Sequence, residues 1–295
     1  MITIKIADQV KGDYAGFQFL TKICNDLQYI ENDLIIFDFI NVYWFDANLC
    51  AVLGACFNKL YEKLNQVKLI NLNNKLEDIF SRNHFLASFG GLIIPDFYET
   101  TIKYRKNKLT DEKLIHSYLL IELMGRSDFP RLSNAARKET ERSIFEIFSN
   151  AIIHGNCDAM FSCGQYYPHN QPPLIDFTIV DLGNTIKQNV NQFLDSSFSG
   201  KEAIEWAITE KNTTKLKKNN IPGGLGFKVI CDFVELNKGK VQIVSSDGFW
   251  QFEKSGAFSM VLDYEFPGTI VNLEFNLDDK NFYSLQNETI DDIIF

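Results

Sequence analysis

The sequence predicts a mixed α/β fold arranged in two domains, and three observations support this prediction. The chain has 295 residues, roughly twice the length of a typical domain. Hydrophobic residues make up 45% and charged residues 23%, ordinary values for a globular protein, so disorder over most of the length is excluded. Strand-like and helix-like patterns alternate through the first hundred residues, which indicates an α/β layer with some parallel pairing.

The elements of the first domain follow in order. Residues 1–8 alternate apolar and polar as a first strand does, and 34–39 form a short apolar run typical of a buried strand. A helical pattern covers 47–64, a further strand covers 67–72, and a helix starts over 75–80.

The chain turns basic and polar between about 102 and 110, and we place the domain boundary there, with domains at 1–103 and 104–295. The second domain opens with two helical patterns, over 111–124 and from Ser133, as N-cap, to about 154.

Strands dominate the rest of the second domain. Segments 159–167 and 174–180 form a hairpin around a loop rich in proline, and later strands cover 240–244, 257–261 and 269–275.

Charge and composition limit the partners. With 29 basic and 38 acidic residues the net charge is -9, which disfavours nucleic acid or anionic lipid as a partner over the whole surface. No apolar run approaches the roughly 18 residues of a membrane-spanning helix, and the N-terminus lacks a secretory segment. Six cysteines scattered through apolar segments favour reduced thiols. We expect a cytoplasmic protein with no membrane partner.

The densest chemical signal is Glu146, Asn150 and His154, spaced four apart and therefore on one face of a helix. A carboxylate one turn from a carboxamide can orient water and supply an oxygen ligand to Mg²⁺. Taken alone, the same pattern is also that of a buried helix with one polar stripe.

A second signal follows the apolar strand at 174–180. Asp181 at the strand end can accept a hydrogen bond from an exocyclic amine, and Gly183 allows a ligand close to the backbone. By itself, Asp-x-Gly is also a common turn.

A third signal is the glycine-rich segment 222–227 before an apolar helical pattern. Such a turn exposes backbone N–H groups at a helix N-terminus, a ready anion site, although it can also be an ordinary loop. The basic segment 211–220 before it is long enough to act as a lid whose lysines approach phosphate.

The order of these motifs, ending in a strand that begins Gly268-Thr269, resembles the GHKL ATPase superfamily of Bergerat-fold nucleotide binders. The resemblance covers roughly 133–275 and implies an α/β sandwich, with a mixed sheet covered by helices on one face. It also implies ATP and Mg²⁺ as cofactors. Glu146 then corresponds to the general base and Asn150 to the Mg²⁺ ligand. Asp181 corresponds to the adenine-amine acceptor, Gly183 to the residue that admits the base, and Thr269 to a contact through water.

The resemblance assigns phosphate binding to the backbone of the glycine turn, formed by Gly223, Gly224, Leu225 and Gly226. It also suggests a phosphate contact from Lys215, on the basis of position alone. One departure from the family stands out, because its second glycine in the Asp-x-Gly-x-Gly motif is Thr185 here.

Residues 38–49 resemble the strand-to-helix turn of STAS domains. In that family a Ser or Thr after the equivalent of Asp46 can be phosphorylated, whereas Ala47 and Asn48 stand here, so this chain lacks that switch. An unrelated small α/β domain is the alternative. The resemblance implies a protein partner that binds through this domain.

Three functions remain open: an ATPase switch, a protein serine/threonine kinase like the anti-sigma relatives, and a non-catalytic ATP-dependent interaction module. Two other sites are weaker hypotheses. A zinc site would use His154, Cys157, Cys163 and His169, without a Cys-x₂-Cys knuckle. Autophosphorylation would use His116, which lies on a helix before the ATPase core.

Overall fold

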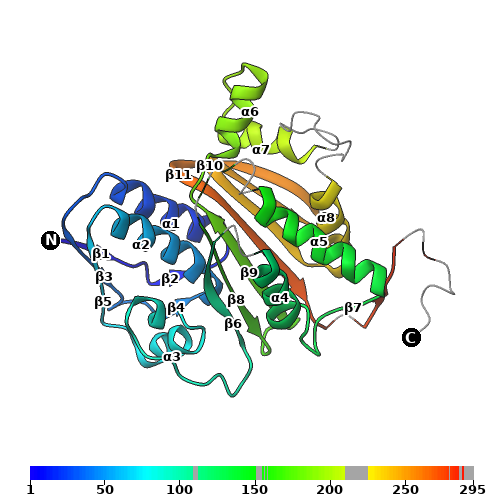
Figure 1. Cartoon of the computed structure of the whole chain (residues 1–295), viewed down its shortest axis with the longest axis horizontal. Coiled ribbons are helices and arrows are strands. Elements are labelled where there is room, and N and C mark those ends of the chain that lie inside the picture. Colours follow the sequence, from blue (N-terminus) through cyan, green and yellow to red (C-terminus); the bar gives the residue numbers. More distant parts are fainter. Residues whose placement is uncertain are drawn as a thin grey trace.

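The computed structural model describes residues 1–108, 112–150, 155, 157, 159–209, 225–278, 280–285 and 288. It confirms a mixed α/β architecture with several sheets. The main elements lie in four layers (Figure 1): a small parallel sheet, helices α1 and α2, a five-stranded sheet, and helices α4, α5 and α8.

The N-terminal unit, residues 1–100, is built as predicted from alternating strands and helices. Strands β1 (Ile2–Lys5), β3 (Leu34–Asp38) and β5 (Gln66–Ile70) form a parallel sheet in the order β1-β3-β5. Helices α1 (Tyr14–Leu27) and α2 (Cys50–Glu62) connect them, because parallel neighbours require crossovers.

Smaller elements complete this unit, and each is short: strands β2 (Gln9–Val10) and β4 (Trp44–Phe45), helix α3 (Asn74–Arg82), and 3₁₀ turns Ala47–Leu49 and Leu86–Phe89. The α1 helix begins where its N-cap, Asp13, accepts a hydrogen bond from the Gly16 backbone N–H.

The five-stranded sheet has the order β10-β11-β9-β8-β6. Its strands are β6 (Thr101–Lys108), β8 (Ala159–Tyr167), β9 (Leu174–Asp181), β10 (Lys240–Glu253) and β11 (Gly256–Asn276). Every pairing is antiparallel, so the prediction of a mixed sheet is wrong for these strands. Two of the four pairings, β8 with β9 and β10 with β11, join consecutive strands as hairpins, which are antiparallel by construction.

The basic segment predicted to join the domains is strand β6 itself, and residue 103 lies inside it. The β6 strand is an edge of the sheet. Ile102 and Tyr104 are buried there, while Arg105 and Lys106 face solvent. Charged side chains are the usual protection of an edge strand, which explains why this strand has the composition of a link.

Both faces of the sheet are covered, whereas the sequence predicted helices on one face. On β9, Phe177 and Ile179 belong to the core beneath the C-terminal helices, and Val180, the next residue, packs with the N-terminal unit. Helix α1 contacts β11, and α2 contacts β8 and β9. A strand with two buried faces is apolar throughout, so the alternation that would mark a single covered face is lost.

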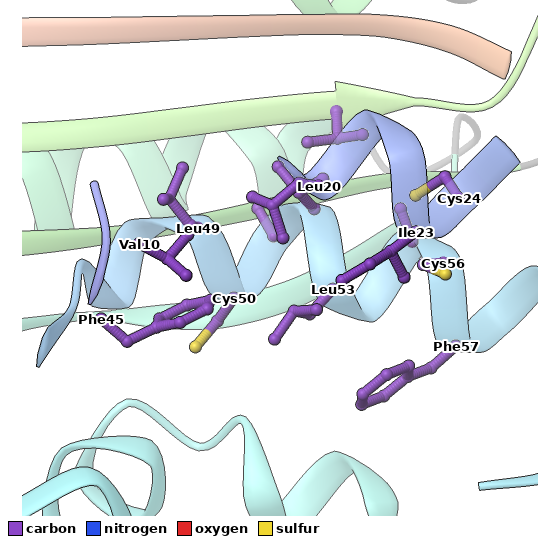
Figure 2. Packing of buried hydrophobic residues seen from close by; sticks show 14 of the residues in the cluster. Val10, Leu20, Ile23, Cys24, Phe45, Leu49, Cys50, Leu53, Cys56 and Phe57 are labelled. Carbon is purple, nitrogen blue, oxygen red and sulfur yellow. The ribbon is translucent and has the colours of Figure 1, made fainter. Parts of the chain in front are cut away.

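The layer between the two sheets is close-packed (Figure 2). Leu20 and Ile23 of α1 lie against Leu53 and Cys56 of α2, and Phe57 points toward the parallel sheet, where it meets Phe37 with ring centroids 4.6 Å apart. The predicted burial of thiols is confirmed for Cys24, Cys50, Cys56 and Cys163.

The other elements lie in the C-terminal half. They are α4 (Glu112–Tyr118), a π-helical turn (Leu119–Leu123), β7 (Arg131–Leu132), α5 (Asn134–Asn150), α6 (Ile186–Leu194), α7 (Gly200–Ile208), α8 (Leu225–Asn237) and β12 (Phe282–Tyr283). None of the helices in the described part of the chain has the length and apolar character needed to cross a bilayer.

Candidate functional site

A row of polar side chains crosses three strands at one end of the five-stranded sheet. Asp181 on β9 is in register with Thr269 on β11, and Thr269 is in register with Ser245 on β10. The hydroxyls of Ser245 and Thr269 are 3.1 Å apart, and Ser245 Oγ also donates to the Gly268 carbonyl at 3.0 Å. By strand alternation these three side chains face the layer of α5 and α8.

Asp181 is the buried acid of this row, with an exposed fraction of only 7%. Burial raises its pKa to about 7, although the backbone N–H groups of Gly183 and Thr269 favour the charged form. The Gly183 N–H donates to Asp181 Oδ1 at 2.9 Å. A further hydrogen-bond donor would stabilise the charged form of this buried carboxyl.

Helix α5 carries Glu146 and Asn150, both half-buried, in its last two turns. The helix begins at the far end of the sheet, where its N-cap Ser133 accepts from the Ala136 N–H at 3.0 Å. There the Ser133 N–H also donates to the Tyr283 carbonyl at 2.8 Å.

The other end of α5 lies toward Asp181, because Gly155 is already beside that carboxyl. The Gly155 carbonyl accepts from the Asn184 N–H at 2.5 Å, and a Cβ at residue 155 would lie 3.3 Å from Asp181 Oδ1. Five residues span at most ~18 Å, so Asn150 is within that distance of Gly155.

Helix α8 lies against α5 on the same face (Figure 1) and is oriented by its last residue. The Asn237 side-chain amide accepts from the Asn276 backbone N–H at 2.7 Å and donates to the Asn276 carbonyl at 2.8 Å. Asn276 is at the far end of β11, so the first turn of α8 is the part directed toward Thr269. Over 13 residues the helix is ~20 Å long, comparable to the ~23 Å from Asn276 to Thr269 along the strand.

Part of the predicted phosphate site lies outside the described residues, namely Lys215, Gly223 and Gly224, together with the predicted lid at 210–220. For Leu225 and Gly226 only the helical backbone at the start of α8 is described. The predicted roles of these residues stay predictions.

Local structure explains the residues at both glycine positions of the Asp-x-Gly-x-Gly pattern, Gly183 and Thr185. A Cβ at residue 183 would lie 2.0 Å from the Gly155 carbonyl oxygen, so chain packing alone requires glycine there. Thr185, at the family's second glycine, is the N-cap of α6, and its side chain forms a reciprocal capping box with Gln188.

The weaker hypotheses concern residues that lie elsewhere. Cys163 is buried against the N-terminal unit, where Asn83 donates to its sulfur at 3.5 Å, while His169 is exposed in the hairpin loop. The described residues contain no group of three or more His, Cys, Asp or Glu that could hold a metal ion, and His154 lies outside them. His116 Nδ1 is 2.9 Å from Glu141 Oε1, and its ring stacks on Phe145.

Ser245 was not predicted. The signal that could have found it is a pair of serines, Ser245 and Ser246, directly after the apolar run of β10. Comparison of the chain with family models, with curated proteins and with solved structures found no match.

Proposed function

We propose that this chain is a Mg-ATP-binding regulatory protein of the GHKL type, with a STAS-like N-terminal unit, that hydrolyses ATP or transfers its phosphate. The observation that carries the proposal is one of position. Asp181 and Thr269 are adjacent on β9 and β11, and the last turns of α5 and the first turn of α8 are both directed toward them.

The donor set fits adenine and Mg²⁺ in different ways. Adenine presents an exocyclic N–H, the donor that the buried Asp181 carboxyl lacks beyond its backbone contacts. The amide oxygen of Asn150 is a hard ligand of the type that Mg²⁺ accepts, and the ion would neutralise charge on the phosphates. Glu146, one turn earlier, would take the proton of the attacking water or protein hydroxyl.

The position of the N-terminal unit suggests intramolecular regulation. Asp46, Ala47 and Asn48 are buried against the sheet face opposite to α5 and α8. The sheet therefore has the candidate nucleotide site on one face and the N-terminal unit on the other. Nucleotide binding would act on that unit through the sheet, as in switches that couple two packed elements.

Asp181→Asn tests adenine binding. The variant keeps the side-chain volume, so the protein should remain folded, and its amide N–H groups would face those of adenine. We expect a loss of ATP affinity of at least about tenfold by calorimetry, roughly 1.4 kcal/mol. Unchanged affinity would remove the adenine assignment.

Glu146→Ala tests the chemistry separately from binding. ATP affinity should stay close to that of the wild type while phosphate release falls by about a hundredfold or more. Glu139→Ala is the matched control on the same helix, because among the described residues Glu139 pairs with Arg142 near the surface. Equal phosphate release from Glu146→Ala and the wild type would leave the helix without a base.

Labelled ATP distinguishes the three functions. Label released as free phosphate indicates an ATPase, label transferred to an added protein indicates a kinase, and binding with no release indicates an interaction module. A protein that binds no ATP at all would overturn the proposal.

A further inference from the structure

A second polar site lies at the opposite end of β9 from Asp181. Here a cavity of about 410 Å³ opens between the N-terminal unit and the five-stranded sheet. Its volume is within the roughly 300–1,000 Å³ of small-molecule sites. The lining side chains that matter are Trp44 and Asp46 from the N-terminal unit, and Tyr167, Asp176, Lys240 and Glu274 from the sheet.

Asp176 is a buried carboxyl with few hydrogen-bond donors around it. Its exposed fraction is 6%, and its one hydrogen bond among the described residues is a long contact of 3.4 Å from Asn272 Nδ2 to Oδ1. Burial raises the pKa of Asp176 well above its usual value, and the carboxylates of Glu274 and Asp46 raise it further, against the effect of Lys240. A buried carboxyl with one weak donor is costly unless a ligand supplies another.

Acidic side chains outnumber basic ones in the cavity lining: Asp13, Asp46, Asp176 and Glu274 against Lys11 and Lys240. Burial lowers the pKa of the Lys240 ammonium, yet the carboxylates of Glu274 and Asp176 together raise it above its usual value. Lys240 Nζ is 2.8 Å from Glu274 Oε2, its neighbour in register on β11. A positive charge is therefore stabilised here even at the cost of desolvation.

Asp46 adds a further carboxyl to the lining and already accepts three hydrogen bonds. It accepts from the Gly12 N–H at 2.7 Å, from Trp44 Nε1 at 2.7 Å and from the Tyr167 hydroxyl at 3.0 Å. These bonds hold the rings of Trp44 and Tyr167 together, stacked with centroids 6.4 Å apart. Aromatic faces next to carboxylates attract cations.

We propose that this cavity binds a small organic cation, with an ammonium or guanidinium group donating to Asp176 and aliphatic carbons against Trp44 and Tyr167. A bare metal ion fits less well, because the described residues form no metal-binding group and the space is far larger than one ion. The ligand would contact both the N-terminal unit and the sheet, so its binding would stabilise their packing.

The test uses agmatine, which carries both cationic groups, in calorimetric titration of the full chain. Agmatine should bind, and n-butylguanidine should bind at least about tenfold more tightly than n-butylurea, in which a neutral urea group replaces the guanidinium. No binding of agmatine at about 10 mM would overturn the proposal, and so would equal affinities for n-butylguanidine and n-butylurea.

Variants locate the site. Asp176→Asn should lower the affinity for agmatine by about tenfold or more, whereas Asp26→Asn, an exposed carboxyl of α1 paired with Lys22, should leave it unchanged. Should Asp176→Asn fail to fold, Trp44→Leu serves instead, since Trp44 is 42% exposed, and a loss of about threefold or more is expected. Wild-type affinity in a folded variant of either kind would place the cation elsewhere and overturn the proposal.

Discussion

Strand β9 carries two buried aspartates, Asp176 near its first residue and Asp181 at its last, on opposite faces of the sheet. Burial raises the pKa of both carboxyls. Their surroundings differ. Asp181 lies in a row with the neutral hydroxyls of Thr269 and Ser245, while Asp176 lies in a row with the charged Glu274 and Lys240.

Under the two proposals, this difference sets which kind of ligand each end of the sheet would favour. Next to neutral groups, a carboxyl gains most from a neutral donor such as an amine of a base, because no opposite charge is needed to hold it. Next to a second carboxylate, it gains most from a cation that relieves the repulsion. The same residue type thus suits two kinds of ligand, according to its cross-strand neighbours.

The largest expected effect is on the pH dependence of stability. The pKa of Asp181 is about 7 in the folded protein against 3.8 for an ordinary aspartate. Its contribution is fully present below pH 3.8 and is lost as pH rises through 7, on the order of 4 kcal/mol for about three pKa units. Asp181→Asn should therefore lose less unfolding free energy than the wild type between pH 4 and 8, measured by urea denaturation.

The difference between the two curves isolates Asp181, because Asp46 and Asp176 shift in the same direction in both proteins. Asp263→Asn, an exposed carboxyl on β11, should give a curve parallel to that of the wild type. If unfolding free energy depended on pH in the same way in Asp181→Asn and in the wild type, the Asp181 carboxyl would be solvated. The comparison between the two buried aspartates would then fail.

A smaller effect is expected at the amide that serves Asp176. The fully buried side chain of Asn272 bonds to Thr178 at 2.7 Å, to Gln242 at 3.0 Å and to Asn48 of the N-terminal unit at 3.1 Å. Asn272→Ala leaves these partners unsatisfied and should cost about 2–4 kcal/mol of unfolding free energy.

The control for this measurement is Asn58→Ala, which removes two exposed bonds, one to Glu62 and one from Lys106, and should cost less than about 0.5 kcal/mol. Similar small losses in both variants would show that the polar contacts add nothing to the packing of the N-terminal unit on the sheet.

Much of the element order could be predicted because local patterns were strong. The parallel strands at 34–38 and 66–70, and the hairpin around the proline-rich loop, match their sequence signals. The sequence singled out Asp181 and Thr269 because it predicts one at the end of a strand and the other at the start of a strand. The structure places them in register, although the predicted strands at 257–261 and 269–275 are one strand, β11.

The second face of the sheet and the Asp176 cavity could not be predicted. Val180 and Phe177 are both apolar, so the sequence does not reveal that they meet different layers. Asp176, Lys240 and Glu274 become neighbours only through strand register. Likewise, Ser245 to Gly248 has the composition of a loop, but register shifts there keep β10 in one long hairpin with β11.

The smallest expected effect separates packing from binding next to Asp181. Thr185 stands where the resemblance expects glycine, and it caps α6 through Gln188. Thr185→Ala should cost about 1 kcal/mol in unfolding free energy, since the capping oxygen is lost, while Thr185→Gly should cost only a few tenths. Calorimetry should give the same ATP affinity for both variants and the wild type, because the Thr185 hydroxyl is occupied by the helix N-terminus. A loss of ATP affinity in Thr185→Ala without the expected loss of stability would mean that this hydroxyl belongs to the nucleotide site. The contrast between the two ends of β9 would then include the turn that follows Asp181 as well as the two aspartates.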